Sequence, residues 1–161
     1  MLTSDKLNRR QLLIGASAGA LGIGAAALSP MTALASDSGS LVGTWDVQIT
    51  DLTAQGGPTT IEGATTFAPG GGVVTMDSNG PSTGIGSWAK KGGRAFGARF
   101  MQFGFGPTPA DTAKVVVTVK GKLTEDDSIS GTFTYKVYDL QGHLLFGDGK
   151  GTFTGKRFSA A

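Results

Sequence analysis

From residue 41 onward the sequence alternates apolar and polar side chains almost without interruption. A period of two places alternate side chains on opposite faces of a β-strand, and a half-buried strand turns its apolar set toward the core. No segment of this part shows the 3.6-residue period of a helix. The pattern predicts short strands over residues 41–51, 59–67, 73–76, 84–90, 94–105, 114–123, 129–137 and 143–158, the last as one strand or a strand pair.

One predicted strand departs from strict alternation. Within residues 94–105, Phe96 and Phe100 occupy even positions, whereas Met101, Phe103 and Phe105 occupy odd positions. We expect a β-bulge or bend near Phe100, because an extra residue would bring both sets to one face.

The turns between the predicted strands are short and rich in Gly, Pro and Asp, which is typical of hairpins that connect antiparallel neighbours. We therefore expect an all-β domain, a small antiparallel up-and-down β-barrel of about eight strands. A sandwich is the alternative, and the barrel is favoured because closure removes exposed strand edges. Glycine is abundant, with 27 of 161 residues, and strongly coiled small barrels need such flexible positions.

The first 35 residues have the layout of an export signal. Arg9 and Arg10 precede an uncharged stretch over residues 12–28, and Ala33 and Ala35 are the small residues that a signal peptidase reads. The arginine pair with the two leucines after it resembles a bacterial twin-arginine (Tat) signal. We expect cleavage after Ala35, and export to the periplasm or the cell exterior. The uncharged stretch is shorter than the about 20 residues of a spanning helix, so we expect no stable membrane anchor after cleavage.

These observations divide the chain into a signal peptide (1–35), a short linker (36–40) and the barrel domain (41–161). The formal net charge of +2 is carried by the signal segment, so the barrel domain is close to neutral. Nucleic-acid binding requires clustered Lys and Arg that displace counterions. We therefore expect no nucleic-acid partner.

The two ends of the barrel domain carry a family resemblance. Gly43-Thr44-Trp45 resembles the G-x-W signature of the lipocalins and the wider calycin group. In that group an arginine near the end of the last strand lies across the tryptophan at the barrel floor, and Arg157 stands at that position here. The resemblance implies structural roles for Gly43, Trp45 and Arg157, with a cation–π contact of about 0.5–2 kcal/mol.

The middle of the chain is similar to small exported bacterial proteins with lipocalin-like barrels. The similar pieces are Thr66-Phe67-Ala68-Pro69-Gly70-Gly71, Gly84-Ile85-Gly86-Ser87-Trp88, Arg94-Ala95-Phe96 and Ser130-Gly131-Thr132-Phe133-Thr134 with Asp139. A typical lipocalin is longer, has a helix packed outside the barrel, and carries a T-D-Y motif that this chain lacks. The resemblance therefore implies the barrel and leaves the ligand open.

The predicted interior either fills the barrel or encloses one small ligand. Gly63, Gly86, Gly121 and Gly131 stand at inward positions, where missing side chains would leave room, although tight coiling would also explain them. Tyr135 could orient a ligand by hydrogen bonding, and Arg99 could hold an anionic head group. The candidate ligand-binding residues are Trp45, Phe67, Trp88, Arg99, Met101, Phe103, Phe133 and Tyr135.

The chain has no cysteine and one histidine, His143, so we expect no metal site and no cofactor. The favoured function is an exported barrel that binds a small, largely apolar molecule. The first alternative is a cyclase or isomerase of the allene-oxide-cyclase or dirigent type, which the strand pattern also resembles. Its polar group would be Tyr135, Arg99 or Glu62. The second alternative is a non-enzymatic structural or interaction protein, and the oligomeric state is left open.

Overall fold

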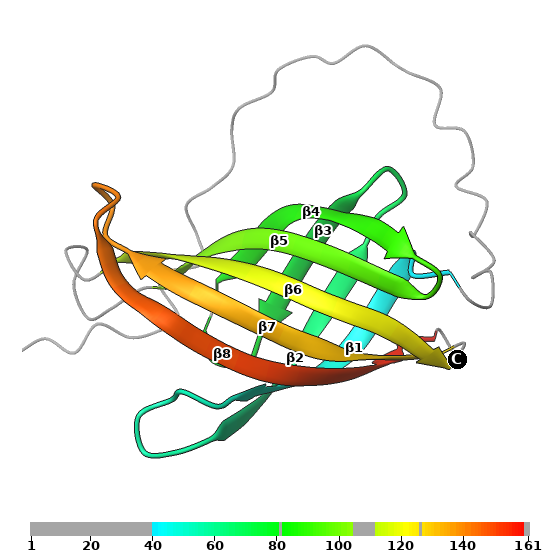
Figure 1. Ribbon diagram of the computed structural model, residues 1–161, viewed down its shortest axis with the longest axis horizontal. Helices are drawn as coiled ribbons and strands as arrows, with labels where there is room; N and C mark the ends of the chain where they lie inside the picture. Colours follow the sequence, from blue (N-terminus) through cyan, green and yellow to red (C-terminus); the bar gives the residue numbers. More distant parts are fainter. Residues whose placement is uncertain (1–39, 81, 105–111, 126, 160–161) are drawn as a thin grey trace, which may run out of the picture. The chain divides into compact units, whose positions relative to one another are not determined.

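A computed structural model describes residues 40–80, 82–104, 112–125 and 127–159 (Figure 1). The predicted signal peptide, most of the linker and Phe105 lie outside these ranges. Among the described residues, no helix is long and apolar enough to cross a membrane.

The described residues form an all-β fold, as the alternation of side chains predicts. Each strand pairs antiparallel with the next, and β8 pairs with β1, so the sheet closes into a barrel. The up-and-down barrel is therefore confirmed, and residues 144–157 form one strand rather than a pair. The strands are β1 (Gly43–Asp51), β2 (Thr59–Phe67), β3 (Gly72–Asp77), β4 (Thr83–Gly92), β5 (Ala95–Gly104), β6 (Ala113–Glu125), β7 (Ser128–Tyr138) and β8 (Leu144–Arg157).

The bulge predicted near Phe100 is absent. β5 pairs with β6 without interruption from Ala95 to Gly104, and the irregularity between β4 and β5 lies at Lys90 and Gly92 instead. The alternation along β5 is therefore regular. Its even-numbered residues, beginning with the buried Phe96, face the interior, and its odd-numbered residues face outward.

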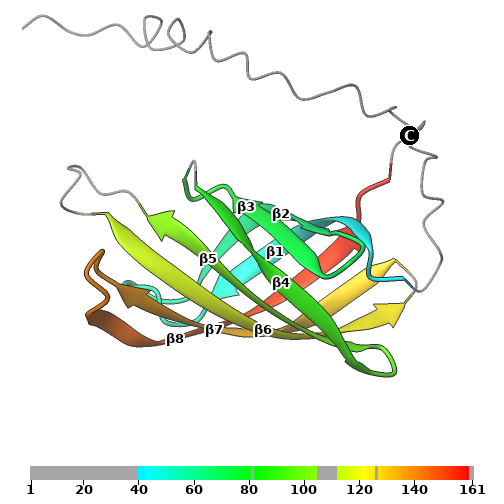
Figure 2. The same ribbon diagram turned by 90° about the horizontal axis from the view of Figure 1, so that it is seen from above.

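The connectivity gives the barrel two different ends. The β2–β3, β4–β5 and β6–β7 turns lie at one end, which we call the floor, together with the start of β1 and the end of β8 (Figures 1 and 2). The β1–β2, β3–β4 and β7–β8 connections lie at the opposite end, which we call the mouth. The buried core is concentrated toward the floor, where Leu41 and Trp45 are almost completely enclosed.

Arg157 lies over Trp45 at the floor. The two residues pair across β1 and β8, and the guanidinium carbon lies 4.3 Å from the indole centroid. Trp45 donates a hydrogen bond from Nε1 to the Leu41 carbonyl at 2.9 Å. Arg157 donates to the carbonyls of Val42 (2.9 Å) and Ser40, so it ties the segment before β1 to the end of β8.

Gly43 makes room for this contact. Its φ of +131° lies in the region that L side chains rarely adopt, and a Cβ at this position would lie 2.7 Å from Nη1 of Arg157. The G-x-W glycine is thus required both by backbone conformation and by the arginine packed against it.

Candidate functional site

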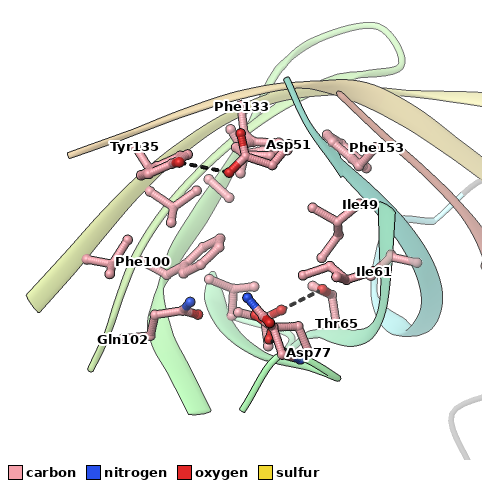
Figure 3. Close-up of a pocket in the computed structure, with 18 of the residues that line it drawn as sticks. Ile49, Asp51, Ile61, Thr65, Asp77, Phe100, Gln102, Phe133, Tyr135 and Phe153 are labelled. Carbon is pink, nitrogen blue, oxygen red and sulfur yellow. Dashed lines mark hydrogen bonds between the residues drawn. The ribbon is translucent and has the colours of Figure 1, made fainter. Parts of the chain in front are cut away.

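A cavity of about 280 Å³ occupies the barrel between the core and the mouth (Figure 3). Its walls come from the inward-facing residues of β1, β2, β3, β5, β6, β7 and β8, because the alternation turns one side chain in two toward the axis. Most of these side chains are aliphatic or aromatic. The lining residues are Val47, Ile49, Asp51, Ile61, Thr65, Phe67, Val73, Thr75, Asp77, Asn79, Ala98, Phe100, Gln102, Val115, Val117, Val119, Ile129, Phe133, Tyr135 and Phe153.

Asp51 and Tyr135 line one side of the cavity near the mouth, and Thr53 is hydrogen-bonded to Asp51 beside them. Tyr135, on β7, donates its hydroxyl to Oδ2 of Asp51 at 2.8 Å. Oδ1 of Asp51 accepts from the Thr53 backbone N–H at 2.7 Å and from the Thr53 hydroxyl at 2.8 Å. Asp51 is the last residue of β1 and Thr53 follows it in the β1–β2 connection, so the chain folds back on its own carboxylate in a local turn.

These contacts shift the ionisation of both groups. Partial burial alone would raise the pKa of Asp51, but hydrogen bonds from Thr53 and Tyr135 outweigh it and hold that pKa below its usual value. Burial raises the pKa of Tyr135, and the neighbouring Asp51 carboxylate opposes its ionisation further. At neutral pH the site therefore presents an aspartate anion and a neutral phenol.

A second polar group faces it from the other side of the cavity. Figure 3 shows Asp77 and Gln102 opposite Asp51 and Tyr135. Asp77 ends β3, and its Oδ1 accepts a hydrogen bond from the Asn79 backbone N–H at 3.0 Å. Deeper in the cavity the only polar walls among the described residues are Thr65 and Thr75, whose hydroxyls bond each other at 3.0 Å. The cavity is thus apolar in its depth and polar near the mouth.

The structure brings three of the predicted ligand-binding residues to this cavity, namely Phe67, Phe133 and Tyr135. Trp45 faces inward but is completely buried in the floor, below the cavity. Trp88 packs edge-on against Phe67, with ring centroids 5.8 Å apart, and donates from Nε1 to the Ala68 carbonyl at 3.0 Å. Neither tryptophan lines the cavity.

The expected inward orientation is wrong for Met101 and Phe103, and Arg99, whose orientation the sequence leaves open, lies on the same outer face. All three lie at odd positions of β5 and point outward, with Met101 41 % and Phe103 39 % exposed. The reason is the regular alternation of β5, which gives the interior to the even set. Glu62 is also exposed, on the outer face of β2, so it cannot serve as a polar group inside the barrel.

The inward glycines do not create the cavity. A Cβ on Gly86 would lie 2.0 Å from the Arg99 carbonyl oxygen, and one on Gly63 would lie 2.6 Å from that of Met76. At Gly121 and Gly131 the rings of Phe96 and Phe153 already occupy the space. Tight coiling of the strands, the other explanation, accounts for these glycines.

Sequence reasoning missed Asp51, Asp77 and Gln102. Each continues the inward set of its strand by one step: Asp51 follows Val47 and Ile49, and Gln102 follows Phe100. The alternation itself therefore contained the signal. Asp77 was missed because it follows the strand predicted over residues 73–76 and was assigned to the turn. Gln102 was missed because the odd-numbered residues of its strand were expected to face inward.

His143 lies apart from the cavity lining. It stands in the β7–β8 connection, where its Nδ1 contacts Oδ2 of Asp139 at 2.8 Å and its side chain is 78 % exposed. Within the described part of the chain, no group of three or more His, Cys, Asp or Glu side chains is placed to hold a metal ion.

The fold and the site together define a closed eight-stranded β-barrel with an internal cavity, an architecture compatible with a lipocalin-like fold and with ligand binding. Neither the models of known protein families nor the curated proteins compared with this chain match it.

The hydrogen bonds to Asp51 predict a pH effect on stability. A carboxylate whose pKa is lowered by folding contributes stability above its unfolded pKa of about 3.9, and this contribution is lost as the pH falls through the lower folded pKa. In urea unfolding between pH 6 and pH 2, the free energy of unfolding should therefore fall less steeply with decreasing pH for Asp51→Asn than for the unchanged protein. Asp46→Asn, on the exposed face of the same strand, should keep the original slope. Equal slopes for Asp51→Asn and the unchanged protein would contradict the assignment.

Proposed function

We propose that the protein binds a small, largely apolar molecule inside its barrel, after export through the twin-arginine pathway to the periplasm or the cell exterior. The observation that carries the binding proposal is the cavity of about 280 Å³, whose apolar depth meets a few polar groups near the mouth. Small-molecule sites characteristically combine apolar walls with a few polar groups that fix orientation. Fractionation of producing cells tests the location, since a cytoplasmic chain that keeps its first 35 residues would contradict export.

The size of the cavity limits the ligand. An apolar cavity of about 150 Å³ holds one benzene molecule, and the cavity here is nearly twice as large. A fused two-ring compound is therefore a suitable probe. Phe100, Phe133 and Phe153 in the walls would contact it through ring faces and edges.

Naphthalene tests the proposal directly by saturation-transfer NMR with the full chain. Val117 lies in the cavity wall, between Phe100 on β5 and Tyr135 on β7, so Val117→Phe should fill the space and reduce naphthalene affinity by at least about 10-fold. The matched control is Thr118→Phe, which places the same ring on the exposed face of the same strand and should leave affinity unchanged.

The melting temperature of each variant shows whether it is folded. If Val117→Phe does not fold, Val115→Phe, nearer the mouth, tests the same space. The proposal would be overturned if naphthalene did not bind the unchanged protein, or if it bound Val117→Phe and Thr118→Phe equally well.

The cyclase or isomerase alternative gains one specific observation. A neutral tyrosine hydroxyl bonded to an aspartate anion faces an apolar cavity, and such a pair would orient a substrate by hydrogen bonding while the walls hold it in a reactive shape. In an enzyme, Tyr135→Phe would lower turnover more than substrate affinity. A binding protein would show changes in affinity alone.

A further inference from the structure

The charge of the cavity restricts its ligand beyond size and hydrophobicity. Among the described lining residues, the charged side chains are Asp51 and Asp77, and none is Lys, Arg or His. Neither carboxylate has an ion-pair partner in the described part of the chain. Arg99, which could have received an anionic head group, points outward from β5. The cavity therefore opens between two negative charges on opposite sides, neither of which has an ion-pair partner among the described residues (Figure 3).

These charges make the head group of the ligand matter. A carboxylate, phosphate or sulfate would have to leave water next to like charges without a counterion, which is unfavourable. An ammonium group would instead give up water for charge-assisted hydrogen bonds to a carboxylate. A neutral hydroxyl would gain a weaker version of the same bond.

We propose that the ligand is a small amphiphilic amine, with its apolar body among the aromatic and aliphatic walls and its ammonium group between Asp51 and Asp77. This inference rests on the proposed function, because it specifies the head group of the molecule that the cavity takes. It distinguishes this barrel from one built for fatty acids or other organic anions.

Three naphthalene derivatives that differ in the head group test the inference: 1-naphthylmethylamine, 1-naphthalenemethanol and 1-naphthoate. Calorimetric titration of the full chain at pH 7 and low salt should give the order amine, alcohol, carboxylate, with at least about 10-fold between the first and the last. Higher salt should lower the ratio of amine affinity to carboxylate affinity, because salt screens the partly exposed charges.

Removing either charge should reduce the preference. Asp51→Asn and Asp77→Asn should each lower the amine-to-carboxylate affinity ratio by about 3-fold or more, and the pair of substitutions should lower it further. Asp46→Asn removes a carboxylate from the exposed face of β1 and should leave the ratio as it is. If Asp51→Asn fails to fold, Asp77→Asn carries the test, because Asp77 lies outside the Thr53–Tyr135 hydrogen-bond group.

The outcomes separate the two proposals. If unsubstituted naphthalene binds but the carboxylate binds as tightly as the amine, the head-group inference is wrong while the proposed function stands. An amine preference that survives both aspartate substitutions would equally overturn the inference. If naphthalene itself does not bind, the proposed function is wrong.

Discussion

Arg157→Ala is expected to lower the free energy of unfolding by about 3 kcal/mol, because one side chain makes three kinds of contact at the floor. The cation–π contact with Trp45, at 4.3 Å, contributes about 0.5–2 kcal/mol. The guanidinium also satisfies the backbone carbonyls of Val42 and Ser40. A partly buried carbonyl left without a donor costs about 1–3 kcal/mol, less where water can reach it. The exposed ion pair with Asp127 adds little.

Burial of the arginine explains why so much depends on it. Its side chain is only 6 % exposed, so the stem packs on the indole in addition to the charged contacts. Truncation would uncover Trp45, which is completely buried in the unchanged protein. The segment before β1 would then lose its connection to β8.

Urea unfolding followed by tryptophan fluorescence measures the effect. Arg157→Lys should recover only part of the loss, since an ammonium group lacks the planar fork that stacks on the ring and reaches two carbonyls. Lys156→Ala, on the exposed face beside it, should change stability by less than about 0.5 kcal/mol. If Arg157→Ala lowers the free energy of unfolding by no more than Lys156→Ala does, the contact between Arg157 and Trp45 does not stabilise the protein.

The fold could be predicted because alternation is a strong signal wherever one face of a strand is buried. Val47 and Ile49 on β1 face the interior, as does Phe133 on β7. A shift of the strand pairing by one residue would turn such side chains toward solvent. The floor contact was found by another route. G-x-W and a late arginine resemble the calycin pattern, and closure of β8 onto β1 pairs Trp45 with Arg157.

The site was only partly predictable, because β5 carries large apolar residues on both faces. Phe96 and Phe100 face inward, while Met101 and Phe103 are on the outside, and a sequence does not say which set the core takes. Pairing with β6 decides it: Phe100 lies opposite Val117, whose side chain is buried in the barrel. Asp51 shows the opposite case: its charge suggests an exposed position, but its side chain lines the cavity.

The inward glycines were also difficult to interpret from the sequence. A missing side chain can leave room for a ligand or be filled by a neighbouring residue, and the sequence does not distinguish these cases. Gly131 on β7 pairs with Gly121 on β6, so the two backbones approach closely. The ring of Phe153, on β8, lies against both. An aromatic ring that covers glycines on neighbouring strands is a known way to stabilise a strongly coiled sheet.

Gly131→Ala is therefore expected to destabilise the protein by about 3 kcal/mol, at the upper end for overpacking a core. The new Cβ would lie 2.2 Å from the Lys120 carbonyl oxygen and 2.7 Å from both Cα of Gly121 and Cε1 of Phe153. Backbone atoms cannot turn aside as a flexible side chain can, so β6 and β7 would have to separate. Gly104→Ala is the control, because among the described residues no atom beyond its chain neighbours lies within 4 Å of a Cβ there, so this substitution should change the free energy of unfolding by less than about 0.5 kcal/mol. Equal urea midpoints for the two variants would mean that the space beside Gly131 is open and that this glycine enlarges the cavity after all.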